Sequence, residues 1–304
     1  DRQWSRGLGD VYKRQGSNST RLLISTVENG ELENLHKEHQ VTRLSDNIDK
    51  TGSISNDSKK RFFKVLRKYM RKIEEYKVQE VFCIGTAVFR NSKNADEVID
   101  EVKKRFNLEI KMISGEEEGL LTSLGVQSSF ENLENYLIVD IGGQSTELIT
   151  DIDHKLDIQS EDIGVVSMSE NYFNENPINI DREETATNFF NDIFHDKDYA
   201  HRQLIGVSGT FTSLGSIYLN QKIYDENEID KVIISYDSVE NIYENLKTLS
   251  VPKIISTYPS LDPKRAVTIT SGLFLVKNLL KKYKITQLKV SKSDILEGLI
   301  LKYF

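Results

Sequence analysis

Hydrophobic and polar positions in the first half of the chain change period repeatedly, which predicts alternating strands and helices. The apolar run 21–27 predicts a strand, and the turn-forming pair at 29–30 predicts a hairpin to a second strand. A long helix is predicted behind the candidate caps Asn56 and Asp57, and a buried strand at 78–84. The helix carries apolar residues at helical spacing: Phe62, Leu66, Tyr69 and Ile73.

The second half of the chain repeats this order. The apolar run 136–140 predicts a buried strand, with 147–150 as its antiparallel partner, and further strands are predicted at 204–207 and 287–290. Helices are predicted at 164–174, 181–195, 266–282 and 294–303. Because both halves open with a hairpin and continue as alternating strands and helices, we expect two related α/β domains with a ligand cleft between them.

The polar break at 132–135 predicts the boundary between the two halves. Residues 1–15 have no initiating Met, hold the only Trp and show neither strand nor helix periodicity, so we interpret them as a non-native leader. The predicted division is a leader at 1–15, an N-terminal domain at 16–130 and a C-terminal domain at 131–304. The last helix is a candidate to pack back on the first domain.

Composition narrows the class of protein. The 304 residues are 38% hydrophobic and 29% charged, and no run approaches the roughly 18 apolar residues of a membrane helix. We therefore expect a cytoplasmic protein without a membrane partner, which agrees with its single cysteine, Cys83. The 40 basic and 47 acidic residues leave a net charge of −7, which disfavours nucleic acid. A phosphate ligand would have to be held by backbone amides, helix N-termini and metal.

The strongest candidate for chemistry is the segment from Asp140 to Glu147, Asp-Ile-Gly-Gly-Gln-Ser-Thr-Glu. Glycines at 142 and 143 let backbone amides approach a phosphate, while the two carboxylates on opposite arms of the hairpin could reach one Mg²⁺. The alternative is a plain hairpin with two glycines in its turn. Taken alone, this segment does not decide between the two.

Three other segments are weaker alone. Ser208-Gly209-Thr210 would begin a helix, where free N–H groups attract anions, although Ser and Thr also cap helices without any ligand. The turn at 16–19 could bind phosphate or only reverse the chain. The three glutamates at 116–118 are either a solvated helix start or include a general base, and the sequence does not say which one.

Five stretches together resemble the exopolyphosphatase and guanosine pentaphosphate phosphatase (Ppx/GppA) family. They are GSNSTRLLI at 16–24, GTAVFRNSKNADEV at 85–98, ISGEEEGLLTSLGV at 113–126, LIVDIGGQSTEL at 137–148 and IGVSGTFTSLGSI at 205–217. The resemblance spans residue 16 to the end of the chain. Within the family, the chain resembles the short, two-domain form. It implies two actin/hexokinase/Hsp70-like (ribonuclease H-like) domains that close over phosphate.

The resemblance also implies roles for single residues. Glu118 resembles the catalytic base, and Asp140 with Glu147 resembles the pair that holds Mg²⁺ or Mn²⁺. Asn94 matches a residue that the family places near the cleft. The implied phosphate-binding residues are Gly16, Ser17, Asn18, Ser19, Arg90, Gly142, Gly143, Ser145, Ser208, Gly209 and Thr210.

The chain departs from the family pattern at two places. Arg14-Gln15 precedes Gly16 where the family has Asp, a hydrophobic residue and then Gly, so a metal- or water-positioning Asp and a hydrophobic first strand are missing. Gln144 stands where the family usually has a third glycine. Its side chain could narrow the approach of the phosphate or donate an amide to it.

The resulting hypothesis is metal-assisted hydrolysis of a terminal phosphoanhydride of inorganic polyphosphate, with Glu118 activating water. Guanosine pentaphosphate is the alternative substrate. Because of the two departures, a non-catalytic regulator that binds guanosine polyphosphates is a second hypothesis, and a kinase or chaperone-like ATPase is a third. A homodimer is left open as the assembly.

Overall fold

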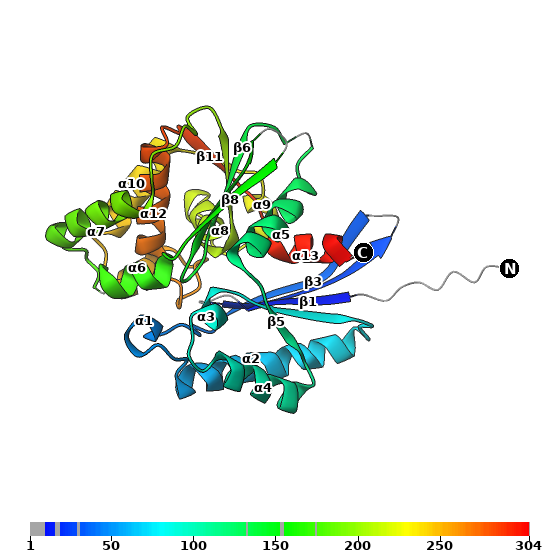
Figure 1. Ribbon diagram of the computed structural model, residues 1–304. Coiled ribbons are helices and arrows are strands. Elements are labelled where there is room, and N and C mark those ends of the chain that lie inside the picture. The colour runs from blue at the N-terminus through cyan, green and yellow to red at the C-terminus, as the bar shows by residue number, and fades with distance from the viewer. Residues whose placement is uncertain are drawn as a thin grey trace. The chain divides into compact units, whose positions relative to one another are not determined.

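The computed structural model describes residues 10–15, 19–28, 31–131, 133–152, 155–173 and 175–303 (Figure 1). The chain divides into two compact units, one made of residues 1–129 and 295–304 and the other of residues 130–294. Across the described ranges, no helix combines the length and the apolar character needed to cross a bilayer.

The first unit contains a mixed sheet in which the order of strands is β3, β2, β1, β4 and β5. β1, β2 and β3 pair antiparallel, whereas β4 runs parallel to β1 and β5 parallel to β4. The strands are β1 (Asp10–Gln15), β2 (Ser19–Glu28), β3 (Glu31–Val41), β4 (Val81–Gly85) and β5 (Ile110–Met112).

Residues 1–15 show no strand periodicity, yet six of them form a strand. Their interpretation as a non-native leader stays a prediction. Asp10–Gln15 is the central strand β1, paired with β2 on one side and with β4 on the other. Strand pairing uses backbone N–H and C=O groups, which every residue except proline carries. The polar sequence DVYKRQ can therefore pair with a strand on each side although it has no strand-like hydrophobic pattern.

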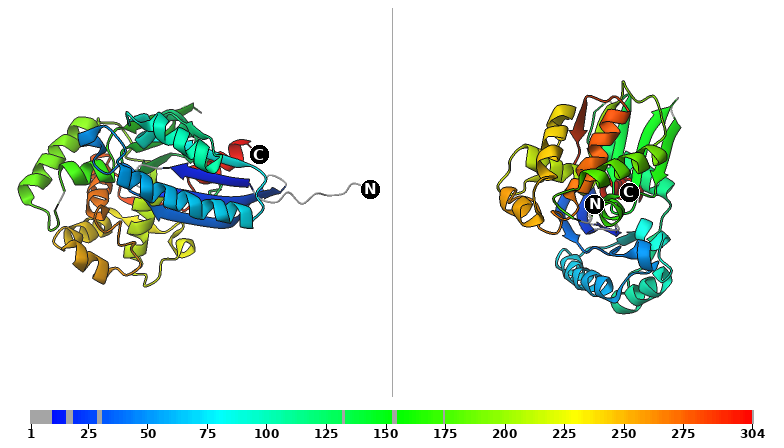
Figure 2. Two further views of the ribbon diagram at one scale, coloured as in Figure 1. Left: turned by 90° about the horizontal axis from the view of Figure 1, so that it is seen from below. Right: turned by 90° about the vertical axis from the view of Figure 1, so that its left-hand side faces the viewer.

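Helices cover both faces of the first sheet (Figure 2). α2 begins behind Ser55, whose hydroxyl accepts a hydrogen bond from the N–H of Ser58, so the cap is not Asn56 or Asp57 as expected. The predicted apolar stripe of this helix is buried, which confirms its assignment. The helices are α1 (Ile48–Thr51), α2 (Asn56–Glu75), α3 (Ala87–Arg90), α4 (Ala95–Phe106), α5 (Gly115–Gln127) and α13 (Ile295–Tyr303).

The last helix of the chain, α13, packs against α5 within the first unit. The contact is close at Gly298, where an added Cβ would lie 1.7 Å from the carbonyl oxygen of Leu121. Apolar side chains of α13, including Leu296 and Leu299, complete a buried cluster beneath the sheet with Leu23 and Ile84. Residues from the two ends of the chain therefore share one core.

The second unit contains a six-stranded sheet with the order β10, β11, β9, β6, β7 and β8. β6, β7 and β8 form an antiparallel meander, while β9 runs parallel to β6 and β11 parallel to β9. The strands are β6 (Tyr136–Ile141), β7 (Thr146–Ile152), β8 (Lys155–Glu161), β9 (Gln203–Val207), β10 (Ile233–Ser235) and β11 (Gln287–Val290).

The helices of the second unit surround one large apolar core. α8 packs on β6 and β9, and α12 contacts α6, α7, α8 and α10. The segment 226–257 contains three helices, α9 to α11, that the hydrophobic pattern did not reveal. The helices are α6 (Val165–Asn171), α7 (Ile180–Ile193), α8 (Ser208–Tyr218), α9 (Glu226–Ile229), α10 (Tyr236–Leu246), α11 (Val251–Thr257) and α12 (Ile269–Lys282).

The two sheets share one topology. In each, the third, second and first strands pair antiparallel, and two later strands continue the sheet parallel to the first. The second sheet adds only β10 at its edge. The predicted duplication of an α/β domain is therefore confirmed, while the predicted ligand cleft between the halves stays a prediction.

Candidate active site

The β6–β7 hairpin brings the two predicted metal ligands together. The register pairs Asp140 directly with Glu147, so both carboxylates project from neighbouring positions on the same side of the sheet. Both side chains are fully buried, at 0% exposure. The Ser160 hydroxyl on β8 donates to Oε1 of Glu147 at 3.0 Å. Two carboxylates buried side by side repel each other, and this is an arrangement that a bound cation would stabilise.

The turn of the hairpin, residues 142–145, is held by the start of α6. The N–H of Gly142 donates to the carbonyl of Ser145, which closes the turn, and the N–H groups of Val165 and Val166 donate to the carbonyls of Gly142 and Gly143 at 2.9 and 2.8 Å. The N-terminal N–H groups of α6 are therefore used to orient this turn rather than to bind a ligand directly.

Gly164 makes this approach of α6 feasible. A Cβ at this position would lie 2.5 Å from the carbonyl oxygen of Gly142 and 2.6 Å from the backbone nitrogen of Gln144. Only glycine therefore allows the start of α6 to lie directly on the turn. The sequence signals Gly164 only as the first residue of the predicted helix at 164–174, whereas α6 begins one residue later.

The orientation of the turn decides which backbone groups it offers to a ligand. The carbonyls of Gly142 and Gly143 are engaged by α6, whereas the N–H groups of Gly143 and Gln144 donate to no group in the described part of the chain. Adjacent backbone N–H groups on a glycine turn form a site for an anion. Ser145 is 3% exposed and adjoins them. This geometry fits the predicted phosphate role of Gly142, Gly143 and Ser145.

The second predicted phosphate turn joins β9 to α8 and contacts the first. Ser208 begins α8 with φ of 68°, a left-handed conformation that costs about 1–2 kcal/mol for a residue with a side chain. The hydroxyls of Ser208 and Thr210 donate to the carbonyl of Ile141 at 3.3 and 3.2 Å. The two turns, which are far apart in sequence, are thereby joined next to Asp140.

Arg265 is a further cationic residue at this place that sequence reasoning missed. It follows α11, and its Nη1 donates to the carbonyl of Gly209 at 2.9 Å and to the hydroxyl of Ser213 at 2.8 Å. Its guanidinium is thus held beside the first turn of α8, where an anion would be stabilised by the charge and by the helix dipole. No local sequence motif marks Arg265, because its position depends on the packing of α8.

In the first unit, the structure separates the three adjacent glutamates at the start of α5. Glu116 is exposed, and Glu117 completes a capping box with Ser114. Glu118 is 1% exposed and accepts a hydrogen bond from Nη1 of Arg90 at 3.2 Å, while the same nitrogen donates to the carbonyl of Ile113. Two predicted site residues of this unit, the partly buried Arg90 and the buried Glu118, therefore form one ion pair.

The remaining predicted residues of the first unit divide into two groups. Gly16, Ser17 and Asn18 lie outside the described residues, and Ser19 is the first residue of β2. The place of Asn94 near the cleft, which the resemblance implies, stays a prediction. The side-chain amide of Asn94 accepts from the N–H and donates to the carbonyl of Ile54, which ties two loops together.

The chemistry of the hairpin fits a hard divalent cation. Mg²⁺ is usually bound through one or two carboxylates, with water and phosphate oxygens completing its shell, and Asp140 with Glu147 supplies such a pair. The described residues contain no cluster of three or more His, Cys, Asp or Glu side chains suited to a metal.

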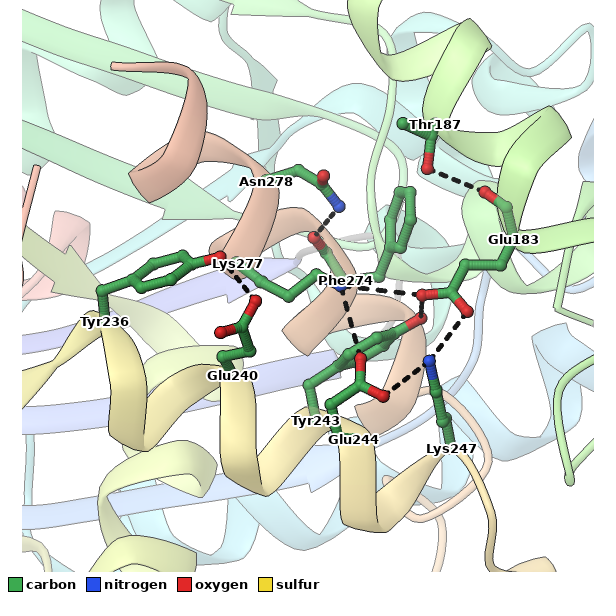
Figure 3. A network of polar contacts seen from close by, with 10 residues as sticks. All are labelled: Glu183, Thr187, Tyr236, Glu240, Tyr243, Glu244, Lys247, Phe274, Lys277 and Asn278. Carbon is green, nitrogen blue, oxygen red and sulfur yellow. Dashed lines mark hydrogen bonds and ion pairs between the residues drawn. The ribbon is translucent and has the colours of Figure 1, made fainter. Parts of the chain in front are cut away.

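A different polar cluster joins α7, α10 and α12 of the second unit (Figure 3). Glu183 accepts hydrogen bonds from the hydroxyl of Tyr243 at 2.8 Å and from Nζ of Lys247 at 3.0 Å. Nζ of Lys277 lies 3.6 Å from Glu183 and 3.7 Å from Glu244. Burial raises the pKa of Glu183, but the hydrogen bonds from Lys247 and Tyr243 and the two lysine charges outweigh it, so its pKa is lowered.

Known proteins resemble this chain over nearly its whole length. A bifunctional 3-dehydroquinate synthase/phosphatase of Fusobacterium nucleatum is 29% identical over 306 residues, which cover 94% of this chain and 45% of that protein. A guanosine-5'-triphosphate,3'-diphosphate pyrophosphatase of Pseudoalteromonas atlantica is 28% identical, with 94% and 56% covered. The chain thus spans about half the length of these curated relatives.

Solved structures support the fold. The crystal structure of an exopolyphosphatase from Cytophaga hutchinsonii superposes with a TM-score of 0.89 at 24% identity and covers 97% of both chains. The model of the Ppx/GppA phosphatase family matches residues 23–304, which include four of the five stretches that carried the resemblance and part of the first. The chain therefore belongs to the Ppx/GppA phosphatase family.

Proposed function

We propose that this chain hydrolyses the terminal phosphoanhydride bond of inorganic polyphosphate. The observation that carries the proposal is the turn 142–145, which lies beside the buried pair Asp140 and Glu147. α6 engages the carbonyls of Gly142 and Gly143, while the N–H groups of Gly143 and Gln144 donate to no group in the described part of the chain. A plain hairpin turn would need neither the buried carboxylates nor the close contact at Gly164.

The proposed reaction is attack of water on the terminal phosphorus. Glu118 accepts a proton from the water, the new P–O bond forms as the anhydride P–O bond breaks, and orthophosphate and a shortened polyphosphate leave. Arg90 holds the carboxylate of Glu118 in one orientation. The N–H groups of the turn stabilise negative charge on the phosphoryl oxygens.

A divalent cation is part of this proposal. Asp140 and Glu147 would hold Mg²⁺ or Mn²⁺, which when bound neutralises phosphate charge and polarises the phosphoryl group. The fit rests on the hard oxygen donors of two facing, buried carboxylates.

Guanosine pentaphosphate is the second candidate substrate. The names of curated relatives favour it, since two of them are guanosine-5'-triphosphate,3'-diphosphate pyrophosphatases. The bond broken would be of the same kind, so the same residues would serve. Selection between the two substrates would then depend on contacts beyond the terminal phosphate.

The decisive experiment measures orthophosphate release from tripolyphosphate and from guanosine pentaphosphate, with Mg²⁺ and with a chelator. We expect turnover only with the cation. Glu118→Gln should reduce kcat by about 10²–10⁴-fold, the usual contribution of a general base. Glu116→Gln is the matched control, because the carboxylate of Glu116 is exposed. This substitution should leave kcat unchanged.

Two results would contradict the proposal. Full activity of Glu118→Gln would exclude this residue as the base. Saturable binding of guanosine pentaphosphate without turnover of either substrate would instead identify the chain as a non-catalytic regulator.

A further inference from the structure

The second unit holds two buried glutamines whose surroundings differ. Gln221 is 7% exposed, and its Nε2 donates to the carbonyl of Asp225 at 3.1 Å and to Oε2 of Glu228 at 2.9 Å. Its Oε1 accepts from the N–H of Asp225. Gln144 is 5% exposed, yet its Nε2 is buried and donates to no group in the residues that the structure describes. The protein satisfies the amide of Gln221, whereas the described residues offer no acceptor to the amide nitrogen of Gln144.

A buried amide donor without an acceptor is destabilising, and native proteins rarely keep one without a reason. The place of Gln144 supplies a reason. Its own backbone N–H and that of Gly143 also make no hydrogen bond in the described part of the chain. Within the described residues, this turn therefore holds three donor groups without an acceptor: two backbone N–H groups and one side-chain amide. They lie beside two carboxylates suited to a cation.

We infer that the side-chain amide of Gln144 is a phosphate-binding group, which donates to an oxygen of the phosphoryl group that the turn 142–145 binds and sets the affinity of this chain for it. The inference rests on the proposed function for the identity of that phosphoryl group. A phosphoryl group has several acceptor oxygens, so one group can satisfy backbone and side-chain donors together.

The chemistry of an amide determines which kinetic constant it controls. A carboxamide stays neutral and neither gives nor takes a proton in the reaction. Its hydrogen bond to a phosphoryl oxygen is present in the bound substrate and in the transition state alike, so it lowers KM and leaves kcat nearly unchanged. Gln144 is therefore a binding residue, distinct in its effect from Glu118.

The experiment compares Gln144→Ala and Gln144→Glu with the matched control Gln221→Ala. For tripolyphosphate, Gln144→Ala should raise KM roughly tenfold, as expected for one lost hydrogen bond to a charged group. Gln144→Glu should raise KM further, because it replaces a donor with an anion of nearly the same size. The control should retain the KM of the wild type but unfold at a lower temperature, because its amide bonds within the protein.

A second measurement does not depend on turnover. Inorganic phosphate with Mg²⁺ should raise the unfolding temperature of the wild type, and this shift should be reduced in Gln144→Ala. Without phosphate, Gln144→Ala should be as stable as the wild type or more stable, because an unsatisfied donor has been removed.

The two proposals fail in different ways. The inference is overturned, and the function left intact, by the following result. The wild type is active, and both Gln144 variants keep its KM and its rise in unfolding temperature with phosphate. A wild type that turns over neither tripolyphosphate nor guanosine pentaphosphate overturns the function. In that case the rise in unfolding temperature with phosphate decides about Gln144. If Gln144→Ala loses this rise, the inference is supported; if Gln144→Ala keeps it, the inference is refuted.

Discussion

The second unit contains two clusters of carboxylates that are built in opposite ways. In the cluster of α7, α10 and α12, Glu183 and Glu244 are bonded to two lysines, and a tyrosine hydroxyl completes the set. In the β6–β7 hairpin, Asp140 and Glu147 face each other across a strand pair, and the neutral hydroxyl of Ser160 bonds to Glu147. The first arrangement balances its charge within the chain, whereas the second places two like charges side by side.

From this difference we expect the first cluster to contribute to stability and the hairpin to contribute to function. A carboxylate that is matched by lysines of the same chain contributes to the free energy of folding. Two buried carboxylates at adjacent positions are a common feature of sites that bind a ligand or a cation. Substitutions in the two clusters should therefore have opposite consequences, and three of them test the comparison.

The largest effect is expected for Asp140→Asn. Orthophosphate release should fall on the order of a hundredfold or more, because the cation would lose one of its two carboxylates. Asparagine keeps the size of the side chain, so the unfolding temperature without ligand should change little compared with the loss of activity. Asp157→Asn on the neighbouring strand is the control, because its carboxylate lies near the surface beside Lys197, and activity should persist. A destabilised but active Asp140→Asn protein would contradict the comparison.

A smaller loss of activity is expected for Gly164→Ala. The added Cβ would clash with backbone atoms of residues 142–144, so the turn would shift and its N–H groups would lose their orientation. We expect kcat/KM to fall roughly tenfold for a shift of this kind. Gly215→Ala is the control, because its Cβ would meet only the side chain of Ile229. It should lower the unfolding temperature but not kcat/KM.

The smallest effect, confined to stability, is expected for Glu183→Gln. Near neutral pH the substitution should lower the free energy of unfolding by about 1–2 kcal/mol, since it removes one member of a hydrogen-bonded charge network. Because the folded pKa of Glu183 lies below its ordinary value of 4.5, the charge of Glu183 stabilises the fold fully above that value. The contribution is lost as the pH falls through the folded pKa.

Denaturant titrations of wild type and Glu183→Gln at neutral and at acidic pH measure this contribution. The difference between the two proteins should shrink as the pH falls below 4.5. Glu184→Gln, exposed on the same helix, should match the wild type throughout. A pH-independent difference would show that the loss comes from packing rather than from charge.

Much of the fold could be predicted because hydrophobic periodicity records burial. The stripe along α2 and the apolar run before Asp140 both became buried elements as expected. The facing of Asp140 and Glu147 also followed from sequence, since a hairpin pairs residues at equal distances from its turn. The duplicated strand order appeared for the same reason, as each half repeats the same local signals.

Other features of the fold and of the candidate site could not be predicted from the sequence, because they depend on contacts between distant segments. β1 is a strand because β2 and β4 offer it backbone partners, not because its residues favour one. Gly164 and Arg265 matter through the turn and the helix against which they lie. The hydrogen bonds between the side-chain amide of Asn94 and the backbone of Ile54 were hidden for the same reason, because Ile54 lies 40 residues earlier in the chain.

By itself, the sequence determined the family, the two α/β halves and the two carboxylates on the arms of the glycine hairpin, because these are recorded in local patterns and in the chemistry of single side chains. Only the tertiary structure decided which of three adjacent glutamates is buried, which carbonyls of the turn are engaged, and which of two buried glutamines has an amide nitrogen without an acceptor among the described residues. Hydrogen bonds are short and directional, so whether a polar group is satisfied depends on atoms that folding brings from elsewhere in the chain.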